Sequence, residues 1–232
     1  MSGNDERIER LMKFCRNFDR DDNDTQSVTS FVTVAPKNSD RPLFALLHTL
    51  SLHNKGSNVY IQSHPDCRKY VEASILPLEL NLHWDTVSLG EDVETQMEPD
   101  FLSIEYALST HCIFGAIRWA LDEVSEVVYL SPATIVTKEI RVHSFDAPIG
   151  VIERGLDNNA TQKFGNLADE FVYIRSSSIL NKWETIAVEK EISASYALDE
   201  LIKDVPFELL DQSLSVSAER AESPYLSQGH HR

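Results

Sequence analysis

The feature that most constrains the fold is a regular alternation of short apolar runs and longer helical patterns between Val28 and Val136. Ser30-Phe-Val-Thr-Val-Ala35 predicts a buried strand, and the leucines of residues 42–53 recur at helical spacing. Further strands are expected at 58–62, 80–84 and 126–130, and helices at 65–75 and 101–122. Strands that alternate with helices indicate a parallel sheet covered on both faces, so we expect an α/β fold.

The second half of the chain is less regular. Residues 135–142 and 148–152 suggest short strands, residues 170–175 a clear strand, and residues 176–183 and 191–203 helices. We therefore expect a helical, acidic arm at 1–27, a single domain at 28–216 and a disordered polar tail at 217–232.

Ligands in open α/β sheets bind at the carboxyl ends of the strands. Two such ends carry polar residues, one at 36–40 after the first strand and one at Ser131-Pro-Ala-Thr134. These two segments are the expected ligand-binding edge of the sheet.

Charge and cysteine content exclude some functional classes. The net charge of −16 disfavours a non-specific nucleic-acid binder and docking on an anionic membrane. No apolar run reaches the roughly 18–20 residues that cross a bilayer, and no signal peptide is visible. Three widely spaced cysteines, Cys15, Cys67 and Cys112, indicate free thiols in a reducing compartment, so we expect a cytoplasmic protein.

Four segments together resemble the GT-A glycosyltransferases, and specifically the compact retaining type of family 8 related to glycogenin. They are residues 30–54, residues 114–136, Phe171-Val-Tyr-Ile-Arg-Ser-Ser-Ser178 with Trp183, and Leu210-Asp-Gln212. The resemblance spans about residues 28–215. It implies a Rossmann-type mixed sheet flanked by helices, a nucleotide-sugar donor and an acceptor with a hydroxyl group.

The chain departs from this family at its metal site. The family carries Asp-x-Asp after the fourth strand, whereas Ser131, Pro132 and Ala133 occupy the matching positions here. A hydroxyl and a methyl group do not replace two carboxylate ligands of Mn²⁺ or Mg²⁺. Ala168-Asp-Glu170 stands where the family has Asn-x-Gly, and the C-terminal His-x-x-Gly-x-x-Lys-Pro segment is absent. We therefore expect neither a metal site nor a cofactor.

Without a metal, fixed cations and hydrogen-bond donors have to neutralise the leaving diphosphate. The resemblance assigns Asp169 and Asp211 to the donor sugar as catalytic carboxylates. The nucleotide-sugar-binding candidates are Ala35, Lys37, Arg41, Arg118, Ser131, Thr134 and Gln212, with Lys138 as a further cation.

Each candidate also has a simpler interpretation. Lys37 and Arg41 suit a solvated surface, Ser131 a Ser-Pro turn and Asp211 a helix N-cap. The leading hypothesis is a metal-independent glycosyltransferase. A degenerate, non-catalytic GT-A-like binding or scaffold module and an unrelated doubly wound α/β domain stay open, as does a homo-oligomer or a protein partner.

Overall fold

A computed structural model describes residues 29–74, 77–86, 112–142, 145–154 and 166–217. The expected arm at 1–27, the first half of the helix expected at 101–122 and the tail from 218 onward lie outside these residues. Ser217, the first residue of the expected tail, belongs to the last strand.

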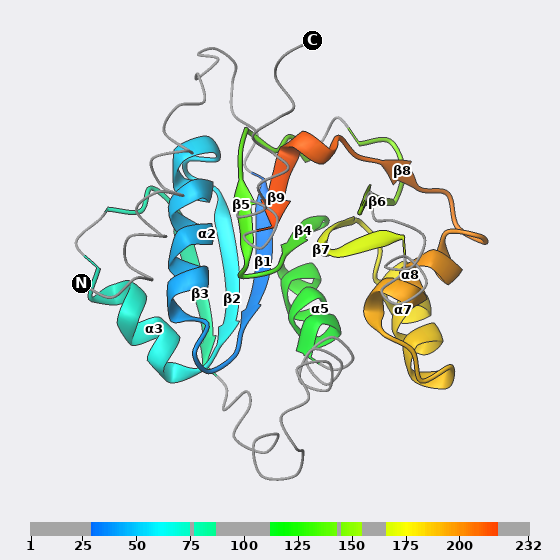
Figure 1. Ribbon diagram of the computed structural model, residues 1–232, viewed down its shortest axis with the longest axis horizontal. Coiled ribbons are helices and arrows are strands. Elements are labelled where there is room, and N and C mark those ends of the chain that lie inside the picture. The colour runs from blue at the N-terminus through cyan, green and yellow to red at the C-terminus, as the bar shows by residue number, and fades with distance from the viewer. Residues whose placement is uncertain (1–28, 75–76, 87–111, 143–144, 155–165, 218–232) are drawn as a thin grey trace, which may run out of the picture.

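The described elements alternate as the sequence predicts (Figure 1). In chain order they are β1 (Ser30–Ala35), α2 (Asp40–His53), β2 (Asn58–Ser63), α3 (Pro65–Glu72), β3 (Asn81–Thr86), α5 (Ile113–Glu123), β4 (Val127–Leu130), β5 (Thr134–Val136), β6 (Ile149–Glu153), β7 (Leu167–Ile174), α7 (Ser177–Glu189), α8 (Ala194–Leu201), β8 (Glu208–Leu209), the 3₁₀ helix η3 (Gln212–Leu214) and β9 (Ser215–Ser217).

Seven of the strands form one mixed sheet in the order β3-β2-β1-β4-β7-β6-β8. The pairs β1–β2, β2–β3, β1–β4 and β6–β8 are parallel, whereas β7 runs antiparallel to both β4 and β6. The antiparallel strand excludes an all-parallel doubly wound sheet, which was the third interpretation of the sequence. Strands β5 and β9 form a separate antiparallel pair.

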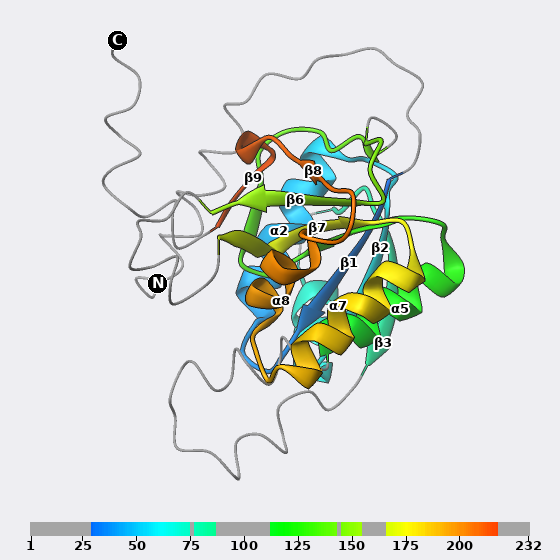
Figure 2. The same cartoon turned by 90° about the vertical axis from the view of Figure 1, so that its right-hand side faces the viewer.

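Helices α2 and α3 cover one face of this sheet, and α5, α7 and α8 cover the other (Figures 1 and 2). An apolar core lies on each side. Alternate residues of β1 point to opposite faces, so Phe31 packs against α2 and α3 whereas Val32 packs against α5, α7 and α8. Trp183 of α7 is fully buried, and its Nε1 donates to the Ala194 carbonyl 2.9 Å away at the start of α8. The helices packed on both faces hold the strands in place, and the strands position the loops at the carboxyl edge of the sheet.

Some element bounds differ from the sequence prediction. The strand expected at 135–142 is only the three-residue β5, because the chain then turns to pair its Thr137 with the segment around η3. The strand expected to start at Glu170 begins three residues earlier, at Leu167, where the Asp199 carboxylate of α8 accepts from the Asn166 and Leu167 amides at 2.8 and 3.1 Å. Both deviations come from contacts between segments that are distant in the sequence.

Candidate active site

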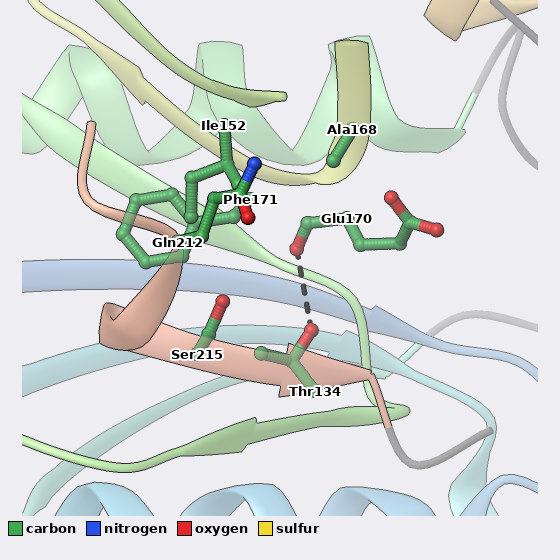
Figure 3. A pocket seen from close by; sticks show the side chains of 7 residues that line it. All are labelled: Thr134, Ile152, Ala168, Glu170, Phe171, Gln212 and Ser215. Carbon is green, nitrogen blue, oxygen red and sulfur yellow. Dashed lines mark hydrogen bonds between the residues drawn. The ribbon is translucent and has the colours of Figure 1, made fainter. Parts of the chain in front are cut away.

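The carboxyl ends of β1, β4 and β6 meet the amino end of β7 at one edge of the sheet, because β7 runs the other way. Most of the sequence-predicted residues lie in the segments that leave this edge. A pocket opens there between the end of β6, the start of β7 and the β5–β9 pair (Figure 3). Its lining residues are Thr134, Ile152, Ala168, Glu170, Phe171, Gln212 and Ser215.

Both apolar and polar side chains line the pocket. Ile152, Ala168 and Phe171 supply the apolar side, and hydroxyl, amide and carboxylate groups supply the rest. Its volume is about 40 Å³, which holds a few water molecules. A larger ligand would therefore lie partly outside the cavity or require rim side chains to turn.

A tight turn follows the end of β4. The Ser131 amide donates to the Glu170 carbonyl at 2.9 Å, and the Thr134 amide donates to the Ser131 carbonyl at 2.9 Å. The Thr134 hydroxyl donates to the same Glu170 carbonyl at 3.3 Å and is 2% exposed. Ser131 and Thr134 thus join the end of β4 to β7, the turn role that was their simpler interpretation.

An ionic cluster lies beside the pocket. Arg154, which follows β6, contacts the Asp169 carboxylate at 2.5 Å, the Glu170 carboxylate at 3.2 Å and the Ser195 hydroxyl at 2.9 Å. Burial raises the pKa of Glu170, the neighbouring Asp169 raises it further, and Arg154 opposes both effects. The cluster carries two carboxylates against one guanidinium, so it is net negative when both carboxylates are ionised.

Arg154 was missed in the sequence prediction. Its signal was its position directly after the strand expected at 148–152, because the carboxyl-end rule applies to that strand as well. The rule was applied only to the first and fourth strands.

A second ion pair flanks the pocket. Lys138 contacts Asp211 at 2.6 Å, and Asp211 also caps η3 by accepting from the Ser213 amide at 2.8 Å. Lys138 first, and then the Ser213 amide, hold the pKa of Asp211 well below its usual range, so this carboxyl stays ionised. The adjacent Gln212 lines the pocket and donates from Nε2 to the Glu153 carbonyl at 3.0 Å.

The remaining candidates are spread more widely. Ala35 is fully buried, and its carbonyl accepts from the His64 amide at 2.9 Å. Lys37 is exposed on the segment that joins β1 to α2, and Arg41 is half-buried in the first turn of α2. Asn38 in this segment has φ of 69°, a left-handed conformation that shapes the loop.

Arg118 lies in a different environment from the other candidates. It is on α5, where it contacts Glu184 of α7 at 2.5 Å and Asn181 at 3.3 Å. Its side chain therefore supports a helix–helix contact, and the pocket does not include it.

Two observations on the described residues concern metal binding and membrane insertion. Within the described ranges, no three His, Cys, Asp or Glu side chains gather as metal ligands. None of the described helices combines the length and apolar character of a bilayer-spanning segment.

No protein-family model matches the sequence, and no curated protein matches it either. Solved structures do match. The apo form of mouse xyloside xylosyltransferase 1 has a TM-score of 0.53 at 12% identity, over 79% of this chain and 86% of that chain. The glycosyltransferase GlyE of Streptococcus pneumoniae TIGR4 has a TM-score of 0.49 at 15% identity over 80% of this chain.

The chain spans 46% of GlyE, less than half of that protein's length. At these identities structural similarity shows the fold alone, and the match to the mouse enzyme is the evidence for that fold. The protein has a single-domain α/β fold with a mixed seven-stranded sheet of the GT-A glycosyltransferase type.

Proposed function

We propose that this protein binds a nucleotide sugar at the carboxyl edge of its sheet and transfers the sugar to an acceptor hydroxyl without a divalent metal. The observation that carries the proposal is the pocket between the end of β6, the start of β7 and the β5–β9 pair, in a fold similar to that of a xylosyltransferase. Apolar and hydrogen-bonding side chains line it together, and a sugar ring would lie partly outside its volume of about 40 Å³. Descent from family 8 and a cytoplasmic location are part of the same proposal.

Lys37 and Arg41 are the proposed diphosphate-binding residues. Lys37 precedes the 14-residue helix α2 and Arg41 lies in its first turn, which also holds Asp40. The N-terminus of a helix favours anions. Thr134 lines the pocket, and its amide donates to the Ser131 carbonyl in the turn after β4. Arg118, bonded to Glu184, is a weaker candidate than these residues.

Metal independence rests on the ligand chemistry at the end of β4. Ser131, Pro132 and Ala133 offer no carboxylate, and hydrogen bonds already hold this turn to Glu170. The positive charge on the β1–α2 segment would then neutralise the diphosphate as it leaves.

In the proposed reaction the bond from the anomeric carbon to the diphosphate oxygen breaks. The acceptor oxygen bonds to the same carbon, and the acceptor proton passes to the departing diphosphate. Asp169 and Asp211 are the proposed carboxylates that orient the sugar and stabilise the positive charge on its ring. The low pKa of Asp211 keeps that group anionic, as this role requires.

A second candidate function is a non-catalytic sugar-nucleotide-binding or scaffold module. The ionic cluster favours it, because Arg154 is already engaged by Asp169 and Glu170 and the cluster adds no net positive charge for a diphosphate. Such a module would bind the donor without breaking it down.

A thermal-shift screen of UDP- and GDP-sugars, with Mn²⁺ or with EDTA, tests the proposal. A ligand at 100 times its Kd stabilises the fold by about 2.7 kcal/mol. Stabilisation that survives EDTA, with release of the nucleoside diphosphate when an acceptor is added, is the expected result. A tenfold gain in affinity with Mn²⁺ would refute metal independence, and binding without release would favour the second candidate.

The variant Lys37→Met checks the diphosphate site, with Lys55→Met as its matched control. Lys55 follows α2 at the opposite edge of the sheet, where it pairs with Glu79 at 2.6 Å. Only Lys37→Met should weaken binding of the nucleotide.

A further inference from the structure

The seven-stranded sheet ends in two edge strands of different length. Within the residues that the structure describes, β3 pairs only with β2, and β8 pairs only with β6 (Figure 1). β8 has two residues and begins just after Pro206, and a short edge next to a proline is a poor template for further pairing. β3 has six residues, so it is the edge at which another strand could add to the sheet.

One side of the β3 backbone carries hydrogen-bonding groups that no strand of the described ranges pairs with. The Asn81 amide donates to the Ser57 carbonyl at 2.9 Å, so Asn81 and every second residue after it face β2 with their backbone groups. Because these groups alternate in direction along a strand, those of Leu82 and Trp84 face away from β2. Outward-facing amides and carbonyls of this kind can pair with an added strand.

Features that usually protect an edge strand are missing from β3. Natural proteins protect such edges with lysines, prolines, bulges or charges. β3 contains no Lys, Arg, Glu or Pro, and its register with β2 continues without a bulge from Asn81 to Thr86. Its one charged residue, Asp85, already accepts a hydrogen bond from Gln62 of β2 at 3.0 Å. The edge therefore lacks the usual barriers to pairing with another strand.

The side chains of β3 alternate between the two faces of the sheet. Leu82 and Trp84 pack on the face covered by α2 and α3. On that face the Arg68 guanidinium lies 5.7 Å from the centre of the Trp84 ring. His83 lies on the opposite face, stacked on Tyr60 with 4.7 Å between the ring centres. Leu82 and Trp84 are half-buried and His83 is exposed, so each of them keeps surface that a partner strand could cover.

A second copy of β3 is complementary to the first when the two strands run antiparallel about a two-fold axis at His83. In this register Leu82 of each copy lies opposite Trp84 of the other, so the same apolar pair forms twice on one face. Asn81 of each copy lies opposite Asp85 of the other, so the carboxylate of the strand meets an uncharged amide. The outward-facing backbone groups of residues 82 and 84 also meet, as an antiparallel ladder requires.

We propose that the β3 edge is a self-association surface, through which two copies of this chain join into one continuous sheet. The candidate active-site pocket is separated from β3 by β2, β1 and β4, so pairing at this edge involves neither pocket. The inference therefore does not depend on the proposed function.

Sedimentation velocity over a range of protein concentrations tests the association. The unmodified protein should show a reversible monomer–dimer equilibrium. His83→Lys should make it monomeric, because this substitution places two ammonium groups opposite each other across the two-fold axis. His83→Thr is the matched control, since it removes the same stacking on Tyr60 without adding a charge, and it should still form dimers. Circular dichroism checks that both variants keep the fold. Monomers at every concentration, or equal association of the two variants, would overturn the inference.

Disulfide crosslinking tests the register. The two His83 residues would form a non-hydrogen-bonded pair with Cα atoms about 4.5 Å apart, within the range that a disulfide spans. Under oxidising conditions His83→Cys should therefore give a covalent dimer on a denaturing gel, and a reductant should dissociate it. Thr86→Cys is the matched control, because Thr86 is exposed on the same strand but distant from its counterpart in the second copy. Crosslinking of Thr86→Cys as readily as of His83→Cys would overturn the proposed pairing.

Salt dependence separates strand pairing from ion pairing. Each copy has a net charge of −16, so two copies repel each other at low salt. Added NaCl screens this repulsion, whereas backbone hydrogen bonds and the contacts of Leu82 with Trp84 do not depend on it. The dimer should therefore become tighter as salt is added. A dimer that dissociates on addition of salt would depend on ion pairs, and this result would overturn the inference.

Discussion

Replacing Arg154 by Met should destabilise the protein in a pH-dependent way. Removing one partner of a buried ion pair costs about 3–5 kcal/mol, because the other charge is left without compensation. Arg154 is 12% and Asp169 17% exposed, but Glu170 is 39% exposed and partly screened by solvent. We therefore expect a loss of roughly 2–3 kcal/mol near neutral pH.

The pH dependence follows from the direction of the Glu170 pKa shift. This pKa is raised in the folded protein, so stability is lost as the pH rises through it. Arg154 opposes the shift, and its removal raises the pKa further. The destabilisation by Arg154→Met should therefore be larger at about pH 8 than at about pH 5, where Glu170 takes up a proton more readily.

Urea denaturation at the two pH values measures the loss, and thermal unfolding should show a decrease in Tm of roughly 4–12 °C near neutral pH. Arg175→Met is the matched control, because Arg175 is 43% exposed and pairs with Glu126 at 3.1 Å. Because solvent screens this exposed pair, Arg175→Met should destabilise the protein less than Arg154→Met does. Equal losses in the two variants, or a loss from Arg154→Met that does not change with pH, would refute the reasoning.

Three further substitutions or reactions test the structure. Thr49→Val removes the hydroxyl that accepts from the buried Val136 amide at 3.2 Å, and urea denaturation should show a loss of about 1–3 kcal/mol. Trp183→Ala empties a fully buried site and should lower the free energy of unfolding by about 3–5 kcal/mol. The stability of Trp183→Phe should lie between those of Trp183→Ala and the unmodified protein. Equal stability of the two variants would contradict the packing. Burial raises the pKa of Cys67 to about 11, so iodoacetamide at neutral pH should label this thiol only after the protein unfolds. Peptide mass spectrometry measures the labelling. Rapid labelling of the folded protein would contradict the burial of Cys67.

The strands with strong local signals could be predicted from the sequence. β1 spans Ser30–Ala35 as expected, and β2 and β4 differ from their predicted bounds by a residue at one end. Their β-branched, apolar residues are buried on both faces, and such a pattern is visible without knowing the neighbours. The bounds of β5 and β7 were less accurate, because partners distant in the sequence decide where those strands begin and end.

The candidate site was only partly accessible from the sequence. Thr134 and Gln212 line one pocket, and Asp169 lies beside it. Arg118 has the same residue type as Arg154, but its position on α5 gives it a partner on another helix. The sequence shows which side chains can bind an anion. It does not show which of them are already paired with a carboxylate of another element, because that depends on how the elements pack.

The sequence by itself determined an α/β fold and the order of strands and helices, because both follow from local patterns of apolar residues. Only the tertiary structure decided which way the carboxylates of β7 point. Alternation along Ala168–Ile174 predicts one face for Asp169 and the other for Glu170, and the bulge against β6 overrides it. A bulge results from pairing two strands of unequal length, so no period within either strand reveals it.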